Sequence, residues 1–329
     1  MNPVGQPTNT QWFFQPDEGI ESDQLAEIFA RMTLNDLREV SQVSQSWHNF
    51  TVRNTHHHML SLADMSSSID DETVKAYQDR QKLAGKELSF EEALASCLRT
   101  KHALSRDPSN PLLREVHVSN CQLTPELIEA FKKYGTGLHT LSLDSVTLPD
   151  GVVGGFSEMT SRMAELEHLS IVNCNINEAL NLSAMPKLQT LKLENCQHLG
   201  HEPDLTQALQ LKELSLSRCG HIVTAPVIPN GSQMKRLDLY STGIVNPPDL
   251  THASALEVLD LTLCDVLNQA PVIPPGSQLK QLYLENCIAI TQPPNLDHAI
   301  HLQLLNVKGC TGLRGRPVVP QGRRTVVRR

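Results

Sequence analysis

The sequence has few aromatic residues, no targeting segment and no long apolar run. Aromatic residues make up 4% of 329 residues, which indicates an aliphatic and regular core. The first residues contain neither the basic nor the apolar stretch of a secretory signal. No apolar run approaches the roughly 18 residues of a membrane-spanning helix. We therefore expect a protein of the cytoplasm, with the nucleus as the alternative, and no membrane partner.

Acidic residues are missing from the C-terminal segment, residues 300–329. The whole chain has 28 Lys and Arg against 36 Asp and Glu, a net charge of −8, whereas residues 300–329 hold seven basic residues and no acidic one. The rest of the chain therefore carries 21 minus 36, or −15. A nucleic-acid-binding domain is normally basic over its folded surface, so we expect no nucleic-acid partner. Residues 315–329 are expected to be a solvated basic tail, with contact to an acidic partner, a membrane surface or RNA as the alternative.

One pattern, L-x-x-L-x-L-x-x-C, recurs nine times from residue 113 onward. The copies begin at residues 113, 138, 166, 188, 211, 234, 256, 279 and 302. The pattern resembles that of the leucine-rich-repeat family. In L-x-L the two leucines point to the same face of a strand, and only stacking of neighbouring copies buries that face. The sequence therefore predicts an α/β fold, a solenoid over residues 113–314 with a parallel sheet of about nine short strands.

Seven of the eight cysteines occupy the ninth position of this repeat. They are Cys121, Cys174, Cys196, Cys219, Cys264, Cys287 and Cys310. The resemblance implies that this side chain turns inward, where a thiol acts as a small apolar group and weak donor. Since no C-x-x-C pair occurs, we expect a ladder of reduced thiols and neither a metal site nor a cofactor.

The segments between the repeats change character near residue 180. Residues 124–131 predict a helix with Thr124 as its cap and Pro125 in its first turn. Later segments are rich in proline and alternate between two forms, as in residues 203–206 and 225–233, so the full unit is a pair of coils of about 45 residues. Proline disfavours helix, which predicts extended return segments there.

Residues between the repeat leucines point out of the sheet and form the candidate binding face. Two of the four tyrosines lie on this face, beside acidic residues, and tyrosine is a favoured anchor at interfaces. The predicted substrate-binding residues are Lys192, Glu194, Asp238, Tyr240, Asp260, Tyr283 and Glu285. A basic protein surface would suit this patch. A solvated sheet face with incidental tyrosines is the alternative.

Residues 18–54 form a separate helical module after an N-terminal segment, 1–17, that we expect to be disordered. The pattern Ile28-Phe29, Met32, Asp36-Leu37, Val40, Val43-Ser44 and Trp47 closely resembles an F-box, although Ile20-Glu21 stands where that family usually has Leu-Pro. The resemblance implies binding to a Skp-type adaptor of a cullin–RING ubiquitin ligase. The adaptor-facing residues would be Ile20, Leu25, Ile28, Phe29, Leu37, Val40 and Trp47. A plain helical cap on the first repeat is the alternative.

Residues 55–112 are expected to link the module to the solenoid. Two helices are predicted, over residues 71–86 and 89–103, the second opened by a capping box of Ser89 and Glu92. They would pack on the first coil and fix the angle between module and solenoid.

No Walker loop, dinucleotide-binding loop or nucleophile elbow is found, and Cys97 lies in an apolar helical setting that favours a structural thiol. We therefore expect a non-catalytic protein, the substrate-recognition subunit of a Skp–cullin–F-box ubiquitin ligase. Two alternatives remain. One is a leucine-rich-repeat scaffold with no link to a ligase. The other is a bacterial effector that acts in the host cytosol and borrows a host ligase.

Overall fold

The computed structural model describes residues 67–83, 85–104, 113–149, 154–178, 180–318 and 325–329. The F-box-like module at 18–54 and the segment 1–17 lie outside the described residues, as do the seven adaptor-facing residues. Element labels therefore begin at β1 and α4.

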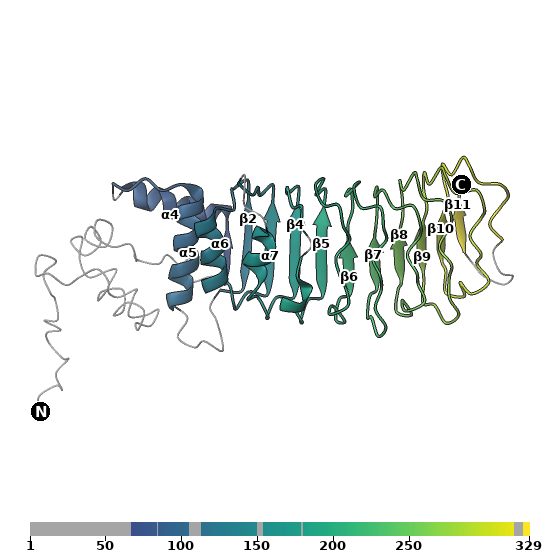
Figure 1. Ribbon diagram of the computed structural model, residues 1–329, viewed down its shortest axis with the longest axis horizontal. Helices are drawn as coiled ribbons and strands as arrows, with labels where there is room; N and C mark the ends of the chain where they lie inside the picture. The colour runs from purple at the N-terminus through teal and green to yellow at the C-terminus, as the bar shows by residue number, and fades with distance from the viewer. Residues whose placement is uncertain (1–66, 84, 105–112, 150–153, 179, 319–324) are drawn as a thin grey trace, which may run out of the picture.

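The described chain is a solenoid built on one parallel sheet of eleven strands in sequence order. Figure 1 shows the coils following one another along the long axis of the molecule, from β2 to β11. The strands are β1 (Ser68–Asp70), β2 (Glu115–Ser119), β3 (Thr140–Asp144), β4 (His168–Val172), β5 (Thr190–Glu194), β6 (Glu213–Ser215), β7 (Arg236–Asp238), β8 (Val258–Asp260), β9 (Gln281–Tyr283), β10 (Leu304–Asn306) and β11 (Val326–Arg328). The predicted leucine-rich-repeat architecture is confirmed, and its nine copies form β2–β10.

Two strands were not predicted, one at each end of the sheet. β1 lies in the expected linker and pairs with β2. β11 corrects the expectation of a solvated tail over residues 315–329: Val326 N–H donates to the Gln303 carbonyl at 2.8 Å, and the Arg328 carbonyl accepts from Val307 N–H at 2.8 Å. The repeat register continues to residue 328, but the last strand lacks the leucine pattern that marks the others.

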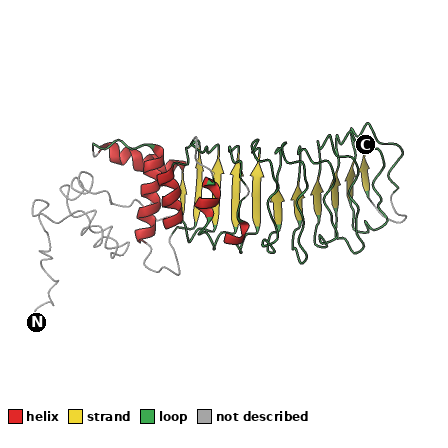
Figure 2. Ribbon diagram, in the orientation of Figure 1, coloured by secondary structure: helices red, strands yellow, loops and turns green. Residues whose placement is uncertain are grey.

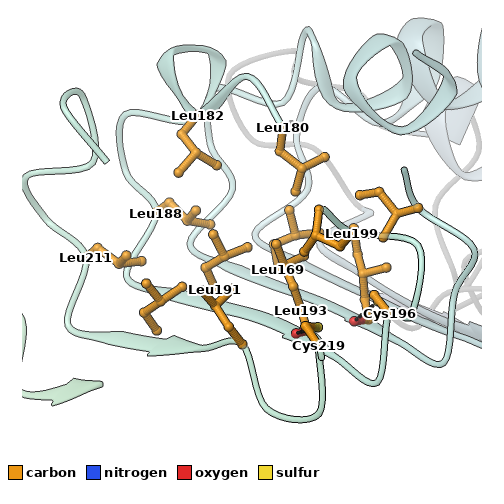
Figure 3. Packing of buried hydrophobic residues seen from close by; sticks show 14 of the residues in the cluster. Leu169, Leu180, Leu182, Leu188, Leu191, Leu193, Cys196, Leu199, Leu211 and Cys219 are labelled. Atoms are coloured by element: carbon orange, nitrogen blue, oxygen red, sulfur yellow. Dashed lines mark hydrogen bonds between the residues drawn. The ribbon is translucent and has the colours of Figure 1, made fainter. Parts of the chain in front are cut away.

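The core is a ladder of aliphatic side chains between the sheet and the return segments. Leu191, Leu214 and Leu237 occupy one position in consecutive coils, and each is at most 1% exposed. Figure 3 shows Leu180 and Leu182 of the return side across the core from the strand leucines. Burying each leucine contributes about 1.5–3 kcal/mol, so the stack of equivalent positions holds the solenoid together.

The return segments change from helical to extended, as predicted. α6 (Pro125–Tyr134) and α7 (Gly155–Thr160) are followed by a single 3-10 turn, η1 (Leu182–Ala184), and no further helix occurs in the described residues after it (Figure 2). Thr124 caps α6 by accepting from Leu127 N–H at 3.3 Å. Each later return buries one proline against the core, namely Pro203, Pro226, Pro248, Pro271 and Pro294. A segment whose prolines cannot donate a backbone bond is well suited to this extended path.

Two helices cover the N-terminal end of the solenoid. They are α4 (Asp71–Leu83) and α5 (Phe90–Leu104), and the capping box is present: Ser89 N–H donates to Glu92 Oε2 at 2.9 Å, and Glu92 N–H to Ser89 Oγ at 3.2 Å. Asp71 ties α4 to β2 by accepting from the amide of Ser119 at 2.8 Å and from its hydroxyl. The buried Lys101 ammonium donates to the Ser68 carbonyl. The helices thereby close the apolar end that a first coil would otherwise expose.

The cysteine ladder is present, and all eight cysteines are free thiols. Each thiol from Cys174 to Cys310 donates to the carbonyl of the sixth repeat position in the preceding coil. For example, the Sγ–O distance is 3.1 Å from Cys219 to Leu193 and 3.0 Å from Cys287 to Leu261. Burial raises the pKa of Cys121 and of Cys174 to about 12. Where burial raises the pKa, the thiols act as weak donors between coils in their protonated form, whereas a hydrogen bond with Cys219 lowers the pKa of Cys196.

The residue before each ladder position has a left-handed backbone. Asn120, Asn173, Asn195 and Asn286 have φ between 52° and 60°, and Gly309 has φ 74°. Asparagine and glycine tolerate this conformation best. The same turn holds Leu263 at φ 61°, where a leucine is strained. This turn lets the chain leave the strand and point the ninth side chain inward.

Candidate functional site

Six outward-pointing side chains, one per coil, form a continuous row across the sheet. The register aligns them in consecutive strands. This central row is Lys192, Ser215, Asp238, Asp260, Tyr283 and Asn306. It contains four of the seven predicted substrate-binding residues. Of the other three, Glu194 ends β5 two positions further along, whereas Tyr240 and Glu285 lie in the turns that follow β7 and β9. The sheet register therefore places five of the seven on one face, and Glu285 joins this face through its bond to Asn306.

The acidic residues of the central row also shape the backbone. Asp238 Oδ1 accepts from Tyr240 N–H at 3.0 Å, and Asp260 Oδ1 accepts from Thr262 N–H at 2.9 Å. Asn306 Oδ1 makes the same bond to Lys308 N–H at 3.2 Å. These bonds occur in coils whose strands have three residues, where β2–β5 have five. These side chains therefore bond the turn that follows the strand as well as facing outward, a role that the sequence pattern did not reveal; β9 is equally short with Tyr283 at this position.

Asp238 and Asp260 sit in different electrostatic surroundings although they are neighbours. Asp238 Oδ2 is 3.3 Å from Arg236 Nη2. Among the described residues, Asp260 forms no ion pair within 4.0 Å. Partial burial raises the pKa of Asp260, and the adjacent Asp238 adds to this rise, against the bonds from Thr262. The centre of the row is thus a half-buried carboxylate that forms no ion pair within 4.0 Å in the described structure, although the charge of Arg236 acts to lower its pKa.

The two tyrosines are half-buried, and each has a polar neighbour. The Arg218 guanidinium lies 5.7 Å from the centroid of the Tyr240 ring, and the Tyr283 hydroxyl donates to Gln281 Oε1 at 3.0 Å. Such contacts hold aromatic rings in place at the surface. Rings that are already positioned lose little conformational freedom when a partner binds.

Glu285 belongs to the same surface but is partly neutralised. Its Oε2 accepts from Asn306 Nδ2 at 2.8 Å, and its Oε1 lies 4.0 Å from Lys308 Nζ. Sequence reasoning missed Arg236 and Arg218 as members of the face. The signal for Arg236 was its place two residues before Asp238, since residues i and i+2 of a strand share a face.

Within the described ranges, no group of three or more His, Cys, Asp or Glu side chains could hold a metal ion. No helix of the described part is both long and apolar enough to cross a membrane.

Comparison with known proteins gives similarity to solved structures alone. No family model and no curated protein matches the chain. Among solved structures, an internalin from Listeria monocytogenes is similar over 74% of this chain and 93% of its own, with 12% sequence identity and a TM-score of 0.28. The assignment as a leucine-rich-repeat solenoid therefore rests on the strands, their register and the leucine ladder of this chain.

Proposed function

We propose that this chain is a substrate receptor. The outward face of the sheet holds a protein, and residues 18–54 connect it to a Skp-type adaptor and a cullin–RING ubiquitin ligase. The observation that carries the receptor role is the central row, in which side chains from six consecutive coils lie in register on one face of the sheet. Ser215 and Asn306 are buried within the row, whereas the other four side chains are exposed or half-buried. The chain itself would supply proximity between substrate and ligase, and catalysis would belong to its partners.

The binding role is supported by the kind of residues on this face. Tyrosine and arginine supply much of the energy of protein interfaces, and Tyr240, Tyr283 and Arg236 share the surface. Asp260 would gain a partner when a lysine or arginine of a substrate approaches, because its carboxylate has no cation within 4.0 Å among the described residues. A protein with a basic patch therefore suits this face.

The adaptor role is supported by the F-box-like pattern of residues 18–54. The test is co-purification of the intact chain with a Skp-type adaptor, followed by identification of proteins whose ubiquitination depends on the chain. Trp47→Ala combined with Ile28→Asp should abolish adaptor binding. Tyr240→Ala combined with Tyr283→Ala should keep the adaptor and lose the substrate. Val245→Ser, a change at an exposed position on the return side, serves as the control. This variant should keep both the adaptor and the substrate.

A leucine-rich-repeat scaffold without a ligase is the second candidate, favoured by the absence of Leu-Pro at Ile20-Glu21. It predicts that partner capture depends on Tyr240 and Tyr283 and is indifferent to Trp47. Failure of the intact wild-type chain to bind any Skp-type adaptor would exclude the ligase role and leave this candidate.

A further inference from the structure

The return side of the solenoid carries a second row of exposed side chains, which the proposed function does not use. Each member directly follows the buried proline of its coil. This return row is Asp204, Val227, Asp249, Val272 and Asn295. Val227 and Val272 are 74% and 78% exposed, and Val318, after Pro317, continues the row at 80%. These valines are the most exposed large apolar side chains of the described residues and occupy equivalent positions, which marks a surface suited to contact.

The valines alternate with polar side chains that are fixed in orientation. Asp204 Oδ1 accepts from Thr206 N–H at 2.9 Å. Asp249 Oδ1 accepts from the amide and the hydroxyl of Thr251, at 2.9 and 2.6 Å. These bonds lower the pKa of both carboxyl groups, so both are ionised at neutral pH. The row therefore presents charge and aliphatic surface in alternate coils.

From Asp204 to Asn295 the return segments contain no Lys or Arg, whereas Val318 follows Arg314 and Arg316. The five return segments, residues 197–211, 219–234, 242–256, 264–279 and 287–302, hold five Asp or Glu and no Lys or Arg. The nearby lysines lie where the chain enters the strands and are bound there: Lys280 Nζ is 2.6 Å from Glu257 Oε2, and Lys212 Nζ is 2.7 Å from Gln189 Oε1. These return segments thus carry a net negative charge, although residues 219–234 contain no Asp, Glu, Lys or Arg, and a basic partner is complementary to them.

We propose that the return row binds an extended, basic segment of a partner protein. Its aliphatic residues contact Val227 and Val272, and its lysines or arginines contact Asp204 and Asp249. Neighbouring coils are about 4.8 Å apart, so equivalent valines recur about every 9.6 Å. A polyproline-type chain advances about 9.3 Å in three residues. The segment therefore has an aliphatic residue at every third position, with basic residues between.

A second copy of this chain suits the row poorly as its occupant. Two return rows facing each other would bring the ionised Asp204 and Asp249 against the same acidic surface of the other copy, and like charges in contact oppose association. The return row also lies on a different side of the coil from the central row, so a segment bound here leaves the sheet face free.

The test uses the full chain and a labelled peptide of five Val-Lys-Pro units, with binding measured by fluorescence anisotropy. We expect binding to weaken about tenfold in a triple variant with Val227→Ser, Val272→Ser and Val318→Ser. We expect the same loss in a double variant with Asp204→Asn and Asp249→Asn. A tenfold loss corresponds to about 1.4 kcal/mol of binding free energy. Circular dichroism confirms that each variant is folded. Val223→Ser, at a 55% exposed position outside the row, and Tyr240→Ala with Tyr283→Ala are the controls, and neither should change the affinity.

Three results would overturn the proposal. The first is no binding of the peptide by the folded wild-type chain, or equal binding of a Val-Glu-Pro peptide. The second is unchanged affinity in the triple serine variant, or loss of affinity in the tyrosine variant. Loss in the tyrosine variant would assign the peptide to the sheet face. The third is self-association of the wild type that the serine changes abolish, because a second copy would then be the occupant.

Discussion

At the scale of single residues, the turn before each ladder position decides which side chains the repeat tolerates. Nine coils place this residue in the left-handed region, and most fill it with asparagine, serine or glycine. Leu263 has φ 61° and bears a bulky side chain in a conformation that costs an ordinary residue about 1–2 kcal/mol. It is also 38% exposed, so it adds little burial in return.

We therefore expect Leu263→Asn to raise the free energy of unfolding by about 0.5–1 kcal/mol, because asparagine adopts this backbone more readily. Denaturation in urea measures the change. The reverse substitution at the equivalent turn, Asn286→Leu, should lower stability by a similar amount. A destabilised Leu263→Asn variant would contradict the account of strain.

Because of the thiol ladder, the free energy of unfolding should depend on pH in the alkaline range. An unfolded cysteine ionises near pH 8.5, whereas burial raises the pKa of Cys121 and Cys174 to about 12. Above pH ~9 the unfolded chain therefore binds fewer protons than the folded chain, and the free energy of unfolding falls as the pH rises further. Each of these thiols should contribute a loss of about 1 kcal/mol between pH ~9 and pH ~10.

Urea denaturation at these two pH values measures this loss, and replacing Cys121 and Cys174 by alanine should make it smaller. An unchanged pH dependence in the double variant would mean that other groups cause the loss.

At the scale of elements, the N-terminal cap depends on a few bonds between α4 and the first full coil. The Asp71 carboxylate accepts from both the amide and the hydroxyl of Ser119. Hydrogen bonds to a charged group are worth about 1.5–3 kcal/mol. Asp71→Ala should therefore lower the unfolding free energy of the cap by about that amount, and hydrogen exchange should show lost protection in α4, β1 and β2. Asp79→Ala, at an exposed position on the same helix, is the matched control. Equal protection in both variants would show that Asp71 does not hold the cap.

Repeated elements could be predicted from the sequence, and single ones could not. The leucine spacing placed β2–β10, and the prolines placed the change to extended returns, because each signal occurs many times in phase. β1 and β11 pair through backbone groups of three residues each, and neither segment carries the repeat leucines that mark the equally short β6–β10. Within the candidate site, alternation applies to the five residues that lie in strands, whereas Tyr240 and Glu285 follow the strand ends. Alternation could not show that Asp238 and Asp260 close turns, since those bonds depend on where each strand ends.

At the scale of the whole molecule, the coils come in two alternating kinds. Returns with an Asp or Asn after the buried proline alternate with returns that have Val there and a left-handed glycine, Gly231 or Gly276. Removing residues 226–270 joins Ala225 to Pro271, which reproduces the natural Ala-Pro junction and keeps the alternation. We expect this two-coil deletion to fold, with lower stability, because each coil contacts only its neighbours.

Removing the single coil 226–247 would instead join two returns of the same kind, with Asp204 and Asp249 in neighbouring coils. This variant should be less stable than the two-coil deletion although it loses fewer residues. Thermal unfolding followed by circular dichroism compares the two variants. The opposite order of stability would show that the alternation has no energetic role.

The parallel sheet in chain order also determines how the molecule would respond to mechanical force. Since every strand pairs only with the strands before and after it in sequence, a pull on the C-terminus loads the bonds of the last coil alone. The coil should detach while the rest of the stack stays intact, and the load then passes to the next coil. Each event releases about 23 residues, or about 80 Å of extended chain. Single-molecule extension should therefore show a series of small equal steps, and the helical cap at the far end should yield last.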